Sequence, residues 1–82
     1  MLLPLPTRDE IIPALRDSDI PLATMADWYD HGVSTFSRYL ADLFPECEPN
    51  GGGLASVRNI RYFLRTGQRG EAPGGWSTRL KP

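Results

Sequence analysis

The sequence predicts a small all-α domain of about four short helices. Its 82 residues are enough for one hydrophobic core and leave no room for a second. Apolar residues recur at helical spacing in three stretches, residues 7–17, 21–44 and 54–66. Prolines and glycines between these stretches indicate loops. We therefore expect an extended arm at residues 1–6, a helical domain at residues 7–67 and an irregular tail at residues 68–82.

The first helix is expected to begin shortly after Thr7. A threonine followed three positions later by a glutamate, here Glu10, forms the capping-box pattern that satisfies two backbone N–H groups at a helix start. Ile11, Ile12 and Leu15 supply the apolar side of this helix. Pro13 lacks an N–H group and would disturb a helix that includes it. We therefore expect a bent or late-starting helix that ends near residue 17.

Residues 21–44 indicate two short helices joined by a tight turn. The first, over residues 22–29, is expected to bury Leu22, Met25, Trp28 and Tyr29. Asp30 and Gly32 can both adopt the positive φ that ends a helix, and Ser34 is expected to cap the next one. That second helix is expected to bury Phe36, Tyr39, Leu40 and Leu43. Its opposite face is expected to carry Ser34, Ser37, Arg38 and Ala41.

The turn and the second helix carry a pattern that resembles helix-turn-helix DNA-binding domains. In that pattern an apolar residue precedes a small one, a second apolar residue follows three positions later, and a turn leads to apolar residues three apart. The matching residues are Met25, Ala26, Tyr29, Val33, Phe36 and Tyr39. The string GVSTFSRYL is similar to the turn and recognition helix of many bacterial repressors and recombinases. Asp30 stands where this family usually has glycine, and His31 where an apolar residue is common.

The resemblance covers residues 21–44, under a third of the chain, and implies binding to double-stranded DNA. It directs four side chains toward bases in the major groove: Ser34, Thr35, Ser37 and Arg38. A guanidinium such as that of Arg38 can read a guanine edge through two hydrogen bonds. Two amphipathic helices joined by a turn also close the core of many small helical domains, so the motif indicates a geometry and not a partner.

After a loop at residues 45–53, a last helix is expected over residues 54–66, ending at Gly67. Its apolar stripe consists of Val57, Ile60, Phe63 and Leu64. Beside that stripe lies a row of arginines, Arg58, Arg61, Arg65 and, beyond the helix, Arg69. Such a row could contact successive DNA phosphates. A solvated face, or pairing with the acidic first half of the chain, is the alternative.

Charge is distributed unevenly along the chain, although the net charge is only −1. Residues 1–50 hold three arginines and nine carboxylates, whereas residues 51–82 hold six basic residues and one carboxylate. An acidic face that includes Asp27, Asp30 and Asp42 could imitate DNA phosphates or cover a basic groove. The chain would then be a small inhibitor (an anti-activator, an anti-repressor or an anti-defence protein) without DNA affinity of its own. Exposed aromatic residues would anchor such a partner, although we expect Trp28 and Tyr29 to lie in the core.

Catalytic and metal-binding residues are few. Cys47 is the only cysteine and His31 the only histidine, which is too little for a typical structural zinc site. His31 lies beside Asp30 and near Ser34, but a triad confined to one turn has no pocket around it. The glycine runs lack the flanking residues of phosphate-binding loops. We expect no enzymatic activity, no cofactor and no metal.

The sequence contains no recognisable targeting or membrane segment. The first ten residues lack a basic region, and two prolines interrupt their apolar run. No stretch approaches the roughly 20 apolar residues that span a bilayer. A lone cysteine suits a reducing compartment. We expect the protein in the cytoplasm of a bacterium or of a host cell.

These observations favour a small sequence-specific DNA-binding protein, either a transcriptional regulator or an accessory factor of a phage or mobile element. Four side chains make a small reading surface, and operators of such proteins are usually symmetric, so we expect a homodimer. The protein-binding inhibitor with an acidic face remains the alternative.

Overall fold

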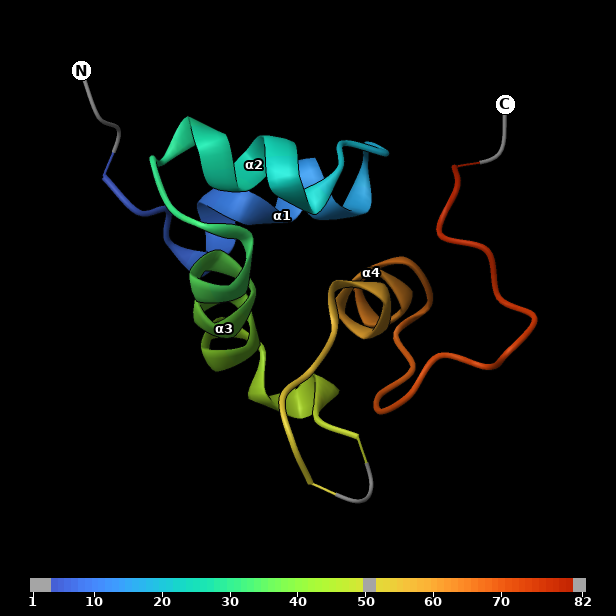
Figure 1. Ribbon diagram of the computed structural model, residues 1–82. Helices are drawn as coiled ribbons and strands as arrows, with labels where there is room; N and C mark the ends of the chain where they lie inside the picture. Colours follow the sequence, from blue (N-terminus) through green and yellow to red (C-terminus); the bar gives the residue numbers. More distant parts are fainter. Residues whose placement is uncertain (1–3, 50–51, 81–82) are drawn as a thin grey trace.

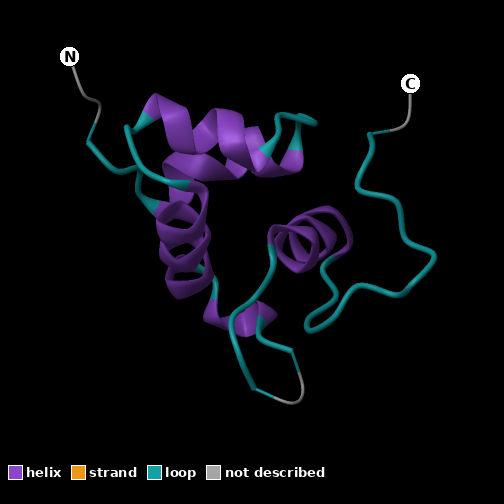
Figure 2. Ribbon diagram, in the orientation of Figure 1, coloured by secondary structure: helices purple, strands orange, loops and turns teal. Residues whose placement is uncertain are grey.

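The computed structural model describes residues 4–49 and 52–80. Within them lie the helices α1 (Arg8–Arg16), α2 (Leu22–Trp28), α3 (Val33–Leu43) and α4 (Val57–Thr66), with a short 3-10 helix, η1 (Pro45–Cys47), between α3 and α4. The described part of the chain contains no strand (Figure 2). The predicted all-α class is therefore confirmed. Met1 to Leu3, Asn50, Gly51 and the last two residues lie outside the described residues, and so does that part of the predicted arm, loop and tail.

The helices surround one hydrophobic core. α2 runs across one end of α3, and η1 lies at the other end of α3 (Figure 1). α4 packs against α1, α3 and η1, and the tail that follows it runs along its outer side. The largest fully buried side chains are Phe36, Phe44, Ile11, Leu15, Met25, Leu40, Ile60 and Cys47. They come from all four α-helices and from the segment around η1, so no helix is peripheral to the core.

α1 begins directly after Thr7, as its sequence signal indicated. The Thr7 hydroxyl accepts a hydrogen bond from the Glu10 backbone N–H, and the Glu10 carboxylate accepts one from the Thr7 N–H. The helix nevertheless continues through Pro13, so the prediction of a late start was wrong. The complete capping box fixes the helix start before the proline, and Pro13 itself is exposed, so its ring lies toward solvent.

The turn between α2 and α3 uses aspartate where a glycine is common. Asp30 adopts φ 56°, and its N–H donates to the Asp27 carbonyl at 3.1 Å while the His31 N–H donates to the Ala26 carbonyl at 3.1 Å. These two bonds form a Schellman motif that ends α2. Gly32 has φ −68° and is the residue that precedes α3, so the prediction of Ser34 as the cap was wrong.

The buried faces of α2 and α3 differ from the predicted ones at two positions. Met25, Ala26, Phe36 and Leu40 are fully buried. Trp28 was expected in the core and is 40% exposed, whereas Ala41 was expected outside and is only 5% exposed. Because α3 packs against both α2 and α4, its buried face is wider than contact with one neighbour would make it. Trp28 lies in the last turn of α2, beside Tyr29, which is partly buried against the core.

α4 is three residues shorter at its start than predicted. Ser56 caps it by accepting from the Asn59 N–H at 3.1 Å, and Leu54 stays outside the helix, 53% exposed. Gly67 ends the helix with φ 79°, a conformation in which only glycine avoids steric strain. From there to residue 80 the chain has no regular secondary structure, as expected for the tail.

Arg8 connects the start of α1 to the end of α3. Its guanidinium donates to both carboxylate oxygens of Glu46, at 2.8 and 2.5 Å, and to the Leu43 carbonyl at 2.7 Å. The same group lies over the Phe44 ring, 4.6 Å from its centroid. The hydrogen bonds from Arg8 lower the pKa of Glu46 from 4.5 to about 2. A charge-assisted bidentate pair therefore closes the side of the domain that contains η1.

This pair predicts how stability depends on pH. Because the pKa of Glu46 is lower in the folded state, its contribution is complete above pH 4.5 and is lost as the pH falls toward 2. Arg8 is partly exposed, so solvent screening reduces the expected contribution to about 1–2 kcal/mol. Urea unfolding at pH 7 and pH 3 should show Glu46→Gln less stable than wild type at pH 7, with the difference shrinking at pH 3. Glu48→Gln, an exposed carboxylate nearby, is the control, and an equal loss in both variants would contradict the assignment.

Candidate functional site

The outer side of α3 carries most of the side chains that were predicted to contact DNA bases. Ser34, Thr35 and Arg38 are exposed, and Ser37 is partly buried. Asp42, one turn after Arg38, continues the same exposed strip. Phe36 and Leu40 lie on the opposite face and are fully buried, which fixes the rotation of the helix about its axis. We call Ser34, Thr35, Arg38 and Asp42 the α3 strip.

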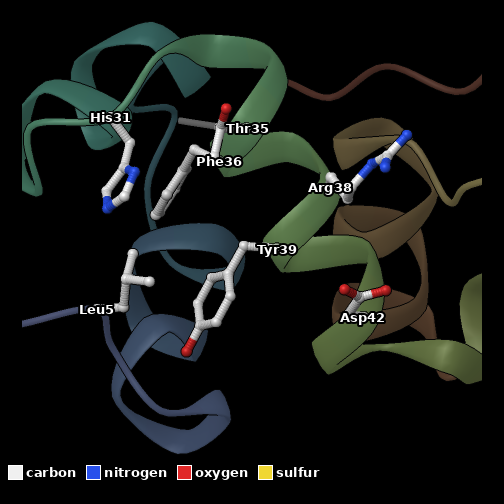
Figure 3. Close-up of a pocket in the computed structure, with 7 residues that line it drawn as sticks. All are labelled: Leu5, His31, Thr35, Phe36, Arg38, Tyr39 and Asp42. Carbon is white, nitrogen blue, oxygen red and sulfur yellow. The ribbon is translucent and has the colours of Figure 1, made fainter.

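The α3 strip stands between two hollows. One has a volume of about 210 Å³ and is mainly apolar, and Figure 3 shows Leu5, His31, Phe36 and Tyr39 gathered around it. The hydroxyl of Tyr39 donates to the Pro6 carbonyl, which holds the described end of the arm against α3. The other hollow, about 570 Å³, is lined by Leu22, Val33, Ser34, Thr35, Ser37, Arg38 and Leu54. Thr35 and Arg38 border both hollows, so the strip forms a ridge.

Exposed apolar residues beside this ridge were not recognised from the sequence. Val33 is 46% exposed and Leu54 is 53% exposed, and both line the larger hollow. Val33 was matched to an apolar position of the helix-turn-helix pattern, which implied burial. It is the first residue of α3, where the helix has no preceding turn to cover it. The only sequence signal for the exposure of Val33 was its position directly after Gly32, the residue that ends the turn.

The acidic candidates lie on two different helices. Asp27 and Asp30 are exposed at the end of α2, on either side of Trp28 and Tyr29 in the sequence. Asp42 belongs to the α3 strip and lines the smaller hollow with Arg38. The acidic surface therefore consists of a pair next to an exposed tryptophan and a separate carboxylate near the strip's arginine.

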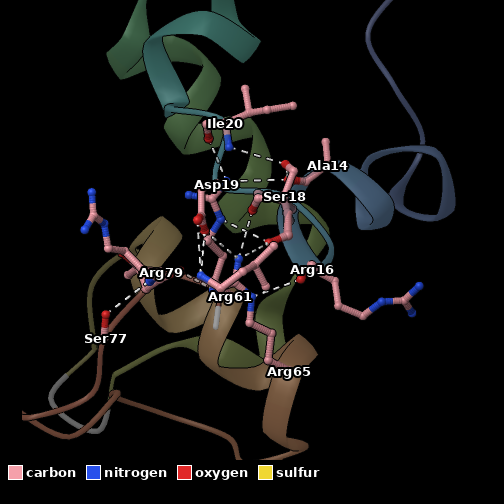
Figure 4. Close-up of polar contacts among 12 residues, drawn as sticks. Ala14, Arg16, Ser18, Asp19, Ile20, Arg61, Arg65, Ser77 and Arg79 are labelled. Carbon is pink, nitrogen blue, oxygen red and sulfur yellow. Dashed lines mark hydrogen bonds and ion pairs between the residues drawn. The ribbon is translucent and has the colours of Figure 1, made fainter. Parts of the chain in front are cut away.

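Arg61, one of the four predicted phosphate-binding arginines, is buried. It is 7% exposed, and its guanidinium donates to the carbonyls of Leu15 at 3.0 Å and Ile20 at 2.6 Å (Figure 4). Burial lowers the pKa of Arg61, and the nearby charge of Arg65 lowers it further. The carbonyls at the end of a helix lack partners within it and carry partial negative charge. Arg61 supplies a cation at that point, so its role in this structure is to close the end of α1.

Arg65 reaches the same end of α1 and also the tail. It donates to the carbonyls of Arg16 at 3.0 Å, Ser18 at 2.9 Å and Leu15 at 3.2 Å. A further bond goes to the Thr78 carbonyl in the tail, and the Asp19 carboxylate lies 3.6 Å away. The Asp19 carboxylate belongs to the acidic half of the chain, as the alternative prediction expected. The other partners of Arg65 are backbone carbonyls.

Arg58 binds the tail alone. Its guanidinium donates to the carbonyls of Ala72 at 3.1 Å and Trp76 at 2.8 Å, and to that of Pro73. Arg69, the fourth arginine of the predicted row, follows the helix and is exposed. Three of the four arginines thus have partners within the chain, and with the tail in place Arg69 is the one of the four that we assign to a DNA surface.

Of the residues considered for catalysis or metal binding, His31 lines the smaller hollow and Cys47 lies in the core. Cys47 is fully buried, and burial raises the pKa of its thiol to about 11. Within residues 4–49 and 52–80, no three histidine, cysteine, aspartate or glutamate side chains lie together as metal ligands would. None of the helices in the described ranges combines the length and apolarity needed to cross a membrane.

Comparisons with known proteins give no further guidance. No protein-family model, curated protein or solved structure matches this chain. The functional argument therefore rests on the residues and geometry described above.

Proposed function

We propose that this chain is a small sequence-specific DNA-binding protein, a transcriptional regulator or an accessory factor of a phage or mobile element. The observation that carries the proposal is the α3 strip, where hydroxyl groups and a guanidinium project from the first two turns of a helix that α2 supports from across its end. Hydroxyl and guanidinium groups are among those that bind base edges in the major groove. The left-handed Asp30 in the turn, at the position where helix-turn-helix domains usually have glycine, supports the same proposal.

In this proposal Ser34, Thr35, Ser37 and Arg38 contact bases, and the exposed Arg69 contacts the DNA backbone. A ridge with a hollow on each side suits insertion into a groove, because the hollows leave space for the two phosphate strands. The strip offers one cation and also contains Asp42, which repels phosphate. A single copy would therefore bind weakly, and we propose a homodimer that reads two half-sites.

The proposal is tested by selecting fragments of the source genomic DNA with the purified protein at two salt concentrations. Enrichment of a few fragments, with affinity that falls as salt rises, is the expected result. Binding without preference among fragments, or no binding at low salt, would contradict sequence-specific recognition.

Arg38→Ala is expected to weaken binding to a selected fragment by about 1–3 kcal/mol and to relax the preference at the base it contacts. The control is Arg16→Ala, which removes another exposed arginine that is paired with its neighbour Asp17 and lies far from α3 in sequence. Both variants are compared by fluorescence anisotropy with matched and mismatched duplexes. Equal affinity and unchanged preference in Arg38→Ala would remove α3 from the reading surface.

The alternative, a protein-binding inhibitor, is supported by one specific observation. Trp28 is 40% exposed at the end of α2 and has Asp27 and Asp30 as close sequence neighbours. Exposed tryptophans concentrate interface energy, and flanking carboxylates favour a basic partner. Replacing Asp27 and Asp30 by asparagine distinguishes the two functions, because it removes both negative charges. Asparagine also tolerates the left-handed backbone of Asp30, so the turn should be preserved. DNA binding should be unchanged or stronger in this double variant, whereas a protein that acts through the acidic pair should lose its partner.

A further inference from the structure

One face of α4 is covered by the tail and carries residues of a kind found at DNA-binding surfaces. Arg58, Tyr62 and Arg65 are spaced four and three residues apart, so their side chains share one side of the helix. Ile60 lies on the opposite side and is fully buried. We call Arg58, Tyr62 and Arg65 the outer face of α4. Two guanidinium groups around an aromatic ring form a surface suited to anionic ligands.

The tail occupies this face through backbone carbonyls. Arg58 donates to three of them, at Ala72, Pro73 and Trp76, and Arg65 donates to the one at Thr78. The Trp76 ring lies edge-on to Tyr62, with ring centroids 5.3 Å apart, and within 6 Å of both guanidinium groups. Each carbonyl is a neutral oxygen acceptor in the position that a phosphate oxygen would take on a bare helix. A phosphate oxygen carries a charge opposite to that of the guanidinium, which a neutral carbonyl lacks, and arginine can bind a phosphate through two parallel hydrogen bonds.

The attachment of the tail is mainly polar: besides the arginine bonds, the Ala72 N–H donates to the Asn59 side chain of α4 at 3.0 Å. From Gln68 to residue 80 it has no helix or strand of its own, so α4 and a bond from the Leu80 N–H to Asp19 hold it in place. Segments with few buried apolar contacts open at much lower cost than the whole domain. In the tail only Ala72 is among the buried apolar residues of the described chain. The tail therefore contributes little to the hydrophobic core.

The covered face also lies next to the proposed reading surface. A hollow of about 510 Å³ separates the start of α4 from the tail and is lined by Leu54, Arg58, Ala72 and Gly74 among others. Leu54 also lines the larger hollow beside the α3 strip. Leu54 thus borders both hollows, and α3 and α4 are in contact, so the start of α4 that carries Arg58 is a neighbour of the α3 strip.

From these observations we propose that the outer face of α4 is a second, phosphate-binding surface for DNA and that the C-terminal tail is its displaceable cover. Arg58 and Arg65 exchange tail carbonyls for phosphate oxygens when the tail moves away. The proposal rests on the protein binding DNA, and it assigns the sequence-independent part of that binding to α4. When the tail is displaced, Arg58 and Arg65 thus take the phosphate-binding role predicted from the sequence. Arg61 continues to bind the carbonyls at the end of α1.

The first test uses the whole 82-residue chain with Trp76→Ala, which removes the side chain that packs on the outer face and leaves every arginine in place. With a DNA duplex that lacks any selected site, we expect the affinity to rise roughly threefold to tenfold at low salt. The slope of the logarithm of the binding constant against the logarithm of the salt concentration should steepen by about two, because two further phosphates are contacted. Leu80→Ala, an exposed side chain in the same tail, should change neither value. Adding Arg58→Ala to Trp76→Ala should cancel about half of the increase in slope. Circular dichroism of each variant checks that the helices remain.

A second measurement follows the tail directly. Trp28→Phe leaves Trp76 as the only tryptophan, so its emission reports the tail alone. Saturating DNA should shift this emission toward that of a solvent-exposed indole. Unchanged emission on saturation, or an unchanged salt slope in Trp76→Ala, would overturn the proposal.

The outcomes separate this inference from the proposed function. One result is a site preference that depends on Arg38 together with an unchanged salt slope in Trp76→Ala. It would support sequence-specific DNA binding and contradict the tail as a cover of α4. A steeper salt slope in Trp76→Ala without preference among fragments would support the cover and contradict sequence-specific recognition.

Discussion

Arg61→Ala should lower the free energy of unfolding by about 3 kcal/mol, because it removes a buried cation and leaves the carbonyls of Leu15 and Ile20 without their donor. A domain of this size is stable by roughly 4–12 kcal/mol, so the loss would be a large fraction of the total. The corresponding fall in melting temperature is roughly 12–24 °C. Thermal unfolding followed by circular dichroism measures it.

Two further variants make the Arg61 experiment specific. Arg61→Lys keeps the charge but offers an ammonium in place of the planar fork, so it should recover only part of the lost stability. Arg38→Ala removes an exposed arginine and should leave the melting temperature within a few degrees of wild type. A melting temperature for Arg61→Ala close to that of Arg38→Ala would show that these carbonyls find water instead, and would contradict a structural role for Arg61.

Phe36→Ala should destabilise the domain by about 3–5 kcal/mol, the range for removing a fully buried phenylalanine. Phe36 stacks on Tyr29, with ring centroids 5.5 Å apart and ring planes inclined by 14°, and also contacts the Tyr39 ring. It therefore joins the end of α2 to the middle of α3. We expect a largely unfolded chain or a melting transition near room temperature.

The matched variant for this site is Phe36→Leu, which fills most of the volume and should cost less than half as much. Urea unfolding of both variants gives the free energies on one scale. If alanine and leucine at this position proved equally tolerated, the junction between α2 and α3 would be loose, and the α3 strip would lack the rigid support that base reading requires.

Local signals in the sequence were reliable where the structure they specify is itself local. The Thr7–Glu10 box and Gly67 act within a few residues of their own position, and both are found as predicted. The cap of α3 was missed because two residues of the turn could take positive φ, and with Asp30 in that conformation the cap is Gly32 and not Ser34. Alternatives within one turn differ by small energies, so composition does not decide between them.

The arginine row shows where sequence reasoning reaches its limit. Regular spacing on one helix describes Arg58, Arg61 and Arg65 equally, yet Arg61 is buried, Arg58 binds the tail, and Arg65 binds both the tail and α1. Their partners are backbone carbonyls, which every residue carries and which leave no trace in composition. The packing of α4 on α1 and of the tail on α4 determines which guanidinium meets which carbonyl. The basic second half of the chain therefore uses much of its positive charge to bind backbone carbonyls of the same chain.

The bonds between α4 and α1 also determine how the chain can fold. The carbonyls that Arg61 and Arg65 bind in α1 and in the segment directly after it lie 41 to 50 positions away in the sequence. Loops of that length must close before the end of α1 acquires its partners, which slows folding relative to a bundle held by neighbouring contacts. The two-helix segment over residues 22–43 buries its apolar side against parts of the chain on both sides of it. Transplanted alone into another protein, that segment would lack a core, and so the α3 strip needs α1 and α4 to support it.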